Sequence, residues 1–247
     1  MIHSIVRFVS LVLVLVAIPL NAGTGENGIR FNVTFWTTDD GLPQNTINKI
    51  IQSSDGYLWL ATNNGIVRFD GARFVTYNSD NIPGLENNRA IDLVETADRK
   101  IWASTYGGGL SVINAQRTRA VNYNTSDGLK TDFLLNIIQD NDGRIWVRSR
   151  SSMQYFENNR FHYFNFNGKP WKNGVGSFFQ DSLNRYWFTF RSGIYVLENG
   201  LNGNWRKVAQ MTYTPDHYYF CTQDPETGHL WFANSNTLVR YRDGGFK

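Results

Sequence analysis

The fold is decided by residues 55–71, which read DGYLWLATNNGIVRFDG. A tight turn at Asp55-Gly56 opens this stretch, and Asn63-Asn64-Gly65 separates two apolar runs, Tyr57 to Thr62 and Ile66 to Phe69. Gly, Asn and Asp adopt the backbone angles that tight hairpins require, so the runs on either side of such turns pair as antiparallel strands. The stretch therefore predicts a β-hairpin built around its single tryptophan.

The hairpin has a further strand at each end. Ile47 to Gln52 precedes it as an alternating run, and Arg73 to Tyr77 follows the turn at Asp70-Gly71. Four consecutive strands joined by tight turns are the building block of a propeller blade.

This four-strand pattern recurs along the chain. Tryptophans in the same local context lie 43, 44, 41 and 44 residues apart, at Trp59, Trp102, Trp146, Trp187 and Trp231. A period of about 40–50 residues is typical of propeller blades, and the tryptophans are predicted to pack each blade on the next. The sequence thus predicts an all-β chain, a β-propeller of about five four-stranded blades, with repeats near 40–78, 80–123, 127–164, 170–208 and 215–247.

Composition agrees with a folded, aromatic-rich β protein. The hydrophobic fraction of 41% and charged fraction of 18% are those of a globular chain, and the aromatic fraction of 15% favours strands. The net charge is +3 and the basic residues are scattered, so no surface for a nucleic acid partner is predicted.

The N-terminus has the layout of a secretory signal. Met1 to Arg7 carries one arginine and no acid, Phe8 to Leu20 is apolar apart from Ser10, and small or helix-breaking residues follow. This order predicts a signal peptide over residues 1–22 and export to the periplasm.

Phe31 to Trp36 resembles an outer strand that lacks its own blade, and such a strand can close a propeller ring by completing the last blade. The chain ends at Gly244 to Lys247, inside the expected outer strand of the fifth repeat. We therefore expect a fragment of a larger ring, with a closed ring of five blades as the alternative.

The motifs resemble those of the two-component regulator propeller family. The first repeat carries the likeness, in DGLPQN at 40–45, DGYLWLAT at 55–62 and GIVRFDG at 65–71. Later repeats keep the tryptophan but depart elsewhere, with Asp98-Arg99 and Leu183-Asn184 where Asp-Gly is expected.

That resemblance implies the periplasmic sensor region of a hybrid histidine kinase or diguanylate cyclase. In such proteins it implies a seven-bladed propeller, often doubled, followed by a small β-sandwich, a membrane helix and a cytoplasmic output domain. No output domain is visible in this sequence, so neither kinase nor cyclase activity is predicted for it.

Catalytic and metal-binding patterns are missing from the sequence. The four histidines have no ligand spacing, and Asp140 to Gly143 has the aspartates of a calcium loop without its downstream glutamate. Cys221 has no neighbouring base and is expected to be a small buried hydrophobic residue. We predict no catalytic residue, no metal and no cofactor.

The remaining candidates are surface residues on one face of the propeller. We define the rim as the loops between second and third strands together with the loops between repeats. The first set contains Asn63, Asn64, Tyr106, Arg150, Arg191, Asn234 and Ser235, and the second Gln44, Asn45, Asn88, Arg89, Lys172 and His217. These residue types can hydrogen-bond a polyhydroxylated or anionic ligand, and each is also a common solvated loop residue.

Three readings of function follow. The favoured one is a non-enzymatic extracytoplasmic ligand-binding sensor module of a bacterial signal-transduction protein, and the alternatives are a secreted propeller enzyme acting on glycans (lyase or hydrolase) and a nonfunctional truncated remnant. The expected partner is an unknown small molecule or oligosaccharide, with a protein partner or homodimer left open. Membrane attachment is expected only through a missing downstream region.

Overall fold

The computed structural model describes residues 33–166, 169–170, 175–190, 193–198, 201, 205–209, 220–233, 237–242 and 244–246. The predicted signal peptide lies outside these residues. Among them, no helix is both long and apolar enough to cross a membrane.

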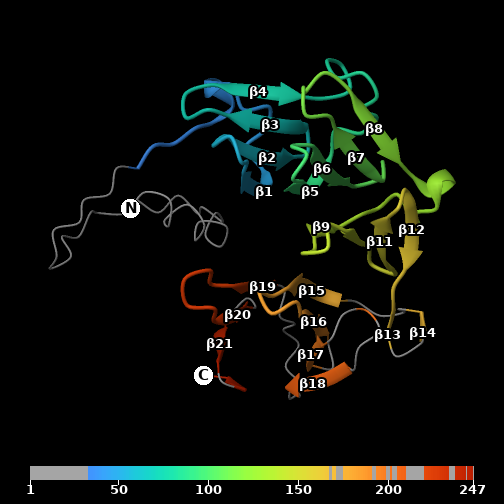
Figure 1. The fold of residues 1–247 in the computed structure, drawn as a ribbon. Coiled ribbons are helices and arrows are strands. Elements are labelled where there is room, and N and C mark those ends of the chain that lie inside the picture. The colour runs from blue at the N-terminus through green and yellow to red at the C-terminus, as the bar shows by residue number, and fades with distance from the viewer. Residues whose placement is uncertain are drawn as a thin grey trace, which may run out of the picture. The chain divides into compact units, whose positions relative to one another are not determined.

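The described chain folds into five four-stranded antiparallel sheets, numbered here in chain order (Figure 1). Sheet 1 contains β1 (Ile47–Gln52), β2 (Leu58–Thr62), β3 (Gly65–Phe69) and β4 (Phe74–Tyr77). Sheet 2 contains β5 (Ala90–Glu95), β6 (Ile101–Thr105), β7 (Leu110–Ile113) and β8 (Ala120–Tyr123). Sheet 3 contains β9 (Asn136–Gln139), β10 (Ile145–Arg148), β11 (Met153–Glu157) and β12 (Arg160–Tyr163).

Sheet 4 contains β15 (Val175–Gln180), β16 (Tyr186–Phe190), β17 (Gly193–Leu197) and β18 (Trp205–Ala209). Sheet 5 contains β19 (Phe220–Gln223), β20 (Leu230–Ala233), β21 (Leu238–Arg242) and β22 (Gly245–Phe246). A two-stranded ribbon, β13 (Asn165–Phe166) and β14 (Lys169–Pro170), lies between sheets 3 and 4 in the sequence. The prediction of an all-β chain with five four-stranded repeats is confirmed.

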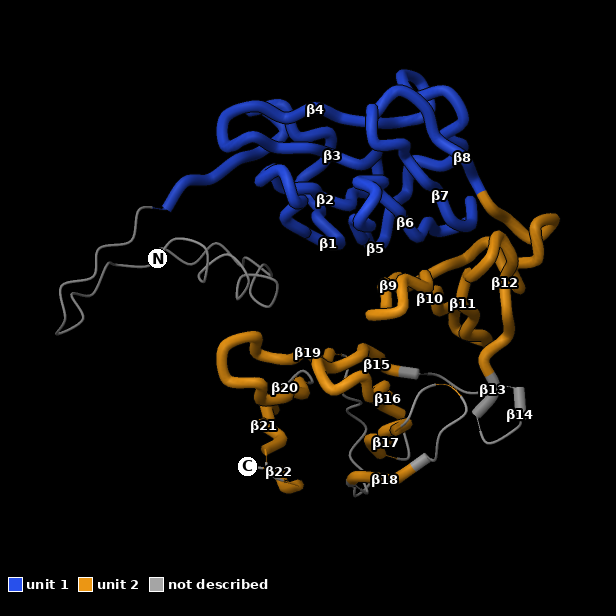
Figure 2. The backbone as a smooth tube through the Cα atoms, viewed as in Figure 1, with its two compact units in different colours: residues 1–122 blue, residues 123–247 orange. Residues whose placement is uncertain are grey.

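The chain divides into two compact units, residues 1–122 and residues 123–247 (Figure 2). Sheets 1 and 2 belong to unit 1, apart from the last residue of β8, and sheets 3, 4 and 5 belong to unit 2.

Each core joins consecutive sheets around the repeated tryptophans. In unit 1, Trp59 is fully buried and packs in one cluster with Ala90 and Ile101 of sheet 2. In unit 2, Trp146 shares a cluster with residues of sheet 4, and Trp187 shares another with residues of sheet 5. Burying such large rings removes a large apolar area from water and stabilises the packing of neighbouring sheets.

The five tryptophans are not equally enclosed. Trp59, Trp146 and Trp187 are 0% exposed and Trp102 is 8% exposed, whereas Trp231 is partly exposed. The indole N–H of each fully buried tryptophan donates to the side chain that lies six residues earlier. Its acceptor is Ser53 for Trp59, Asp140 for Trp146 and Asp181 for Trp187.

A second recurring contact joins the hairpin turns of consecutive sheets. The backbone N–H in the turn after an inner strand donates to the last side chain of the next inner strand. The pairs are Ser54 to Glu95 at 2.6 Å, Asn141 to Gln180 at 2.6 Å, and Ser182 to Gln223 at 2.7 Å. This polar contact fixes the register of one sheet against the next.

The N-terminal segment differs from its predicted strand. Phe31 and Asn32 are outside the described residues, and Val33 to Trp36 pair with no described strand. Val33 and Phe35 are largely exposed, and the Trp36 ring lies edge-on to Phe69 with centroids 5.0 Å apart. The alternation that suggested a strand is present, but without a neighbouring strand edge its backbone groups make no ladder.

Candidate functional site

In unit 1 the rim is formed where two loops meet. The turn between β2 and β3 carries Asn63 and Asn64, and its Gly65 N–H donates to the carbonyl of Asn88 at 2.7 Å. Asn48, from the bulge in β1, donates its side-chain amide to Asn63 Oδ1 at 3.1 Å and to a backbone carbonyl of sheet 2. The structure therefore brings Asn63 and Asn88 into one polar edge, beside the exposed Asn64.

Arg89 and Tyr106 stack on one another at this edge. The Arg89 guanidinium lies over the Tyr106 ring with its Cζ 4.4 Å from the ring centroid, and the Tyr106 N–H donates to the Arg89 carbonyl at 3.0 Å. Such stacking contributes about 0.5–1 kcal/mol at an exposed site. No carboxylate within the described residues forms an ion pair with Arg89, so its charge faces solvent in a preset orientation.

The glycine-rich turn after β6 makes this pairing possible. Arg89 is held by its own N–H, which donates to Asn87 Oδ1 at 2.8 Å. A Cβ atom on Gly108 would lie 2.3 Å from Asn87 Cβ, so only glycine lets the two loops approach this closely. Gly107, Gly108 and Gly109 form the turn between β6 and β7.

Asn88 holds a loop of the rim in place through its side-chain hydrogen bonds. Its Oδ1 accepts from the Ser79 N–H at 2.7 Å, and its amide donates to the Ser79 hydroxyl at 3.1 Å. Asn45 and Asp132 accept the equivalent backbone N–H groups in their own loops, at 3.0 and 2.8 Å. These three side chains shape the connections that lead into sheets 1, 2 and 3.

Gln44 has one buried polar atom without a partner. Its Oε1 is enclosed and accepts no hydrogen bond from the described residues. An unpaired buried amide oxygen costs about 1–3 kcal/mol, so a donor that reached it would bind favourably.

The remaining predicted rim residues belong to unit 2 or lie outside the described residues. Arg150 lies in unit 2, exposed in the tight turn between β10 and β11, where Ser149 and Ser152 are hydrogen-bonded at 2.8 Å. Five predicted rim residues lie outside the described residues: Lys172, Arg191, His217, Asn234 and Ser235.

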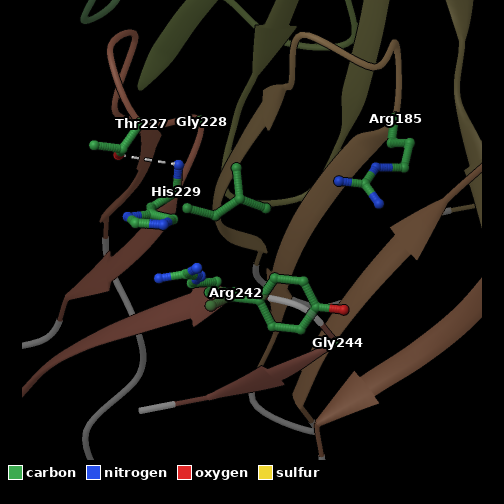
Figure 3. A pocket seen from close by; sticks show the side chains of 8 residues that line it. Arg185, Thr227, Gly228, His229, Arg242 and Gly244 are labelled. Carbon is green, nitrogen blue, oxygen red and sulfur yellow. Dashed lines mark hydrogen bonds between the residues drawn. The ribbon is translucent and has the colours of Figure 1, made fainter.

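Sequence reasoning did not select the pocket of about 400 Å³ at the other end of sheets 4 and 5 (Figure 3). It is lined by turns that precede the second and fourth strands, not by rim loops. Three side chains around it can carry positive charge: Arg185, His229 and Arg242.

The described residues contain no group of three potential metal-ligating side chains, counting His, Cys, Asp and Glu. The calcium-like segment is a hairpin turn in which Asp140 Oδ1 accepts the N–H groups of Asp142 and Arg144. Cys221 is buried, and burial raises the pKa of its thiol to about 12, although Ser177 Oγ accepts a hydrogen bond from it at 3.3 Å.

Comparisons with a family model and with solved structures found proteins similar to this chain. Residues 41–64 match the family model described as two component regulator propeller. This segment is similar to one repeat of that family. The matched segment runs from the loop that carries Gln44 through β1 and β2 to Asn63 and Asn64, so the repeat itself supplies part of the rim.

Solved structures share this β-propeller fold over most of the chain. An extracellular domain from B. thetaiotaomicron, assigned to the hybrid two component system BT4673, superposes with a TM-score of 0.69 and 19% identity over 83% of this chain and 30% of that one. The corresponding domain of BT3049 gives 0.65 and 19% over 84% and 27%. Virginiamycin B lyase from Staphylococcus aureus gives 0.61 and 15% over 80% and 67%.

This chain therefore spans less than a third of the length of the two B. thetaiotaomicron domains. No curated protein matches it.

Proposed function

We propose that this chain is part of an extracytoplasmic sensor of a bacterial two-component type system, and that its rim binds a soluble ligand without turning it over. The repeat matched at residues 41–64 supports the sensor assignment, as does the likeness to extracellular domains assigned to such systems. In the longer protein, occupancy of the rim would bias an output domain that is not in this sequence.

The observation that carries the proposal is the Arg89–Tyr106 pair. An exposed guanidinium that is already oriented loses little conformational freedom when a ligand binds. Its planar N–H donors suit carboxylates, and the ring and amide groups beside it suit a polar or polyhydroxylated surface. Asn63 and Asn64 add further polar groups along the same edge. The ligand is therefore proposed to be a small molecule or an oligosaccharide.

The test is a binding screen of the exported chain against soluble oligosaccharides and sugar acids, read by isothermal calorimetry. For a ligand so found, we expect Arg89→Gln to weaken binding about fivefold or more, equivalent to about 1 kcal/mol. Arg68→Gln is the matched control, because Arg68 stacks on Tyr57 at 4.5 Å without belonging to the rim. Equal affinities for wild type and Arg89→Gln would remove the rim from the binding site.

An enzyme is the second candidate, because virginiamycin B lyase has a similar fold. Tyr106 is the described rim residue that could serve in acid–base chemistry. Incubation with the same panel followed by product analysis should show no cleavage. Cleavage that Tyr106→Phe abolishes would replace the sensor proposal with the enzymatic one.

A further inference from the structure

We propose that the pocket between the hairpin turns of sheets 4 and 5 binds an oxyanion, meaning a phosphate, sulfate or carboxylate group. This site is separate from the rim and does not depend on the proposed sensor function. Its central residue is Arg185, at the start of β16.

Only the Nε edge of the Arg185 guanidinium is hydrogen-bonded within the described residues. Its Nε donates to Asp181 Oδ2 at 2.7 Å, and its Cζ lies 5.3 Å from the Trp187 ring centroid. The carboxylate of Asp181 is fully buried and also accepts from the Trp187 indole N–H at 2.7 Å. These contacts leave the two terminal nitrogens of Arg185, with four N–H donors, without a partner within the described residues.

The pocket collects positive charge around those donors. Figure 3 shows Arg185 reaching in from one side, with His229 and Arg242 on the opposite side. Gly228 and Gly244 contribute backbone alone to the wall, and none of the described residues that line the cavity is acidic. Guanidinium donors that face a cavity favour the binding of an anion there.

In sheet 3, the arginine at the equivalent position is neutralised by neighbouring carboxylates. Arg144 occupies the equivalent position, four residues after a buried aspartate. There it contacts three carboxylates: Asp140 at 3.4 Å, Glu157 at 2.7 Å, and Asp142. The sequence position of Asp142 is taken in sheet 4 by Leu183, which is 68% exposed.

The counterpart of Glu157 also changes its partner. Glu198, at the equivalent point after β17, accepts from Arg206 at 2.9 Å. Arg185 therefore keeps its structural bond to Asp181 and lacks the two outer carboxylates, so that an external oxyanion can bind its terminal nitrogens. A planar guanidinium edge binds such groups through two parallel hydrogen bonds.

The test uses Leu183→Asp, which restores the carboxylate found in sheet 3, with Leu183→Asn as a control of the same size without charge. Inorganic phosphate, sulfate and acetate are titrated into the full chain at constant ionic strength, because screening by salt weakens such binding. Affinity is measured by calorimetry and the location by the backbone amide shifts of Gly228 and Gly244.

We expect saturable binding of phosphate that shifts both glycine amides. Leu183→Asp should weaken it about fivefold or more, and Leu183→Asn should change it less than about twofold. Arg242→Gln should also weaken binding, whereas Arg240→Gln should not, because Arg240 does not line the pocket.

A parallel titration with glucose 6-phosphate distinguishes a free oxyanion from an oxyanion group that belongs to a larger soluble ligand. Tighter binding than that of inorganic phosphate would assign the group to a larger soluble ligand, and equal binding would assign a free ion. Absence of saturable binding, or equal binding by wild type and Leu183→Asp, would overturn the proposal.

Discussion

The Tyr186 hydroxyl donates to the buried carboxylate of Asp140 at 2.7 Å and so joins the second strand of sheet 4 to the hairpin turn of sheet 3. The same carboxylate oxygen, Asp140 Oδ2, also accepts a hydrogen bond from the Trp146 indole N–H at 2.8 Å. Burial, together with the hydrogen bond to Asp140 and its charge, raises the pKa of Tyr186, so the hydroxyl is a donor at neutral pH.

Tyr186→Phe should therefore destabilise the chain by about 1.5–3 kcal/mol, the usual range for a hydrogen bond to a charged group. Equilibrium denaturation in urea measures the change. Tyr163→Phe is the control, because Tyr163 is 56% exposed and should tolerate the change. Similar effects in the two variants would show that the Asp140 bond adds nothing.

The repeated tryptophans should not contribute equally. Trp59→Ala should cost about 3–5 kcal/mol, since it empties a fully buried site between sheets 1 and 2. Trp231→Ala should cost markedly less, because Trp231 is partly exposed. Melting temperatures of both variants compare them directly, and a larger loss for Trp231→Ala would contradict the observed packing.

Stability should fall at alkaline pH because of Cys221. Its thiol has a pKa of about 12 when folded, against about 8.5 in an unfolded chain. A group whose pKa is raised by folding stabilises fully below the unfolded value, and this contribution is lost as the pH rises from about 9 towards 12.

Denaturation at pH 8 and pH 10.5 should therefore show a loss for wild type that is smaller in Cys221→Ala. At pH 8 the thiol should react with a disulfide reagent only as fast as the chain unfolds. Rapid reaction of the folded chain would show that Cys221 is accessible.

The N-terminal segment should contribute little to stability. Val33 and Phe35 are 71% and 69% exposed, and Trp36 makes its ring contact with Phe69 while 42% exposed. Deleting residues 31–36 should shift the melting temperature by less than about 3 °C, equivalent to about 1 kcal/mol or less for a chain of this size. A drop of many degrees would mean that the segment fastens a sheet edge, as in a closed five-bladed ring.

The repeats could be predicted because their signals are local. Trp59 and the turn at Asn63 to Gly65 lie within a few residues of the strands they define, and a period near 43 residues repeats the signal. The short 3-10 turn at Thr38–Asp40 was missed, although its signature is readable: Thr37 caps it and Asp40 closes a capping box.

The rim could be predicted only in outline. Which loop residues share an edge follows from strand order, but whether a side chain is available depends on distant partners. Asn88 binds Ser79, nine residues away, and Arg89 stacks on Tyr106, seventeen positions away at the paired ends of β5 and β6. The pocket at Arg185 was within reach, since aligning the turns of sheets 3 and 4 sets Leu183 against Asp142.

The turn contacts between consecutive sheets have a consequence for the duplication of repeats during evolution. The fourth repeat contributes both a backbone donor, at Ser182, and an acceptor side chain at the end of its inner strand, Gln180. A duplicated repeat inserted beside its parent would bring both halves of the contact with it, and no new substitution would be needed to satisfy its neighbours. Lengthening by whole copies is therefore tolerated from the first generation, whereas a partial copy separates donor from acceptor.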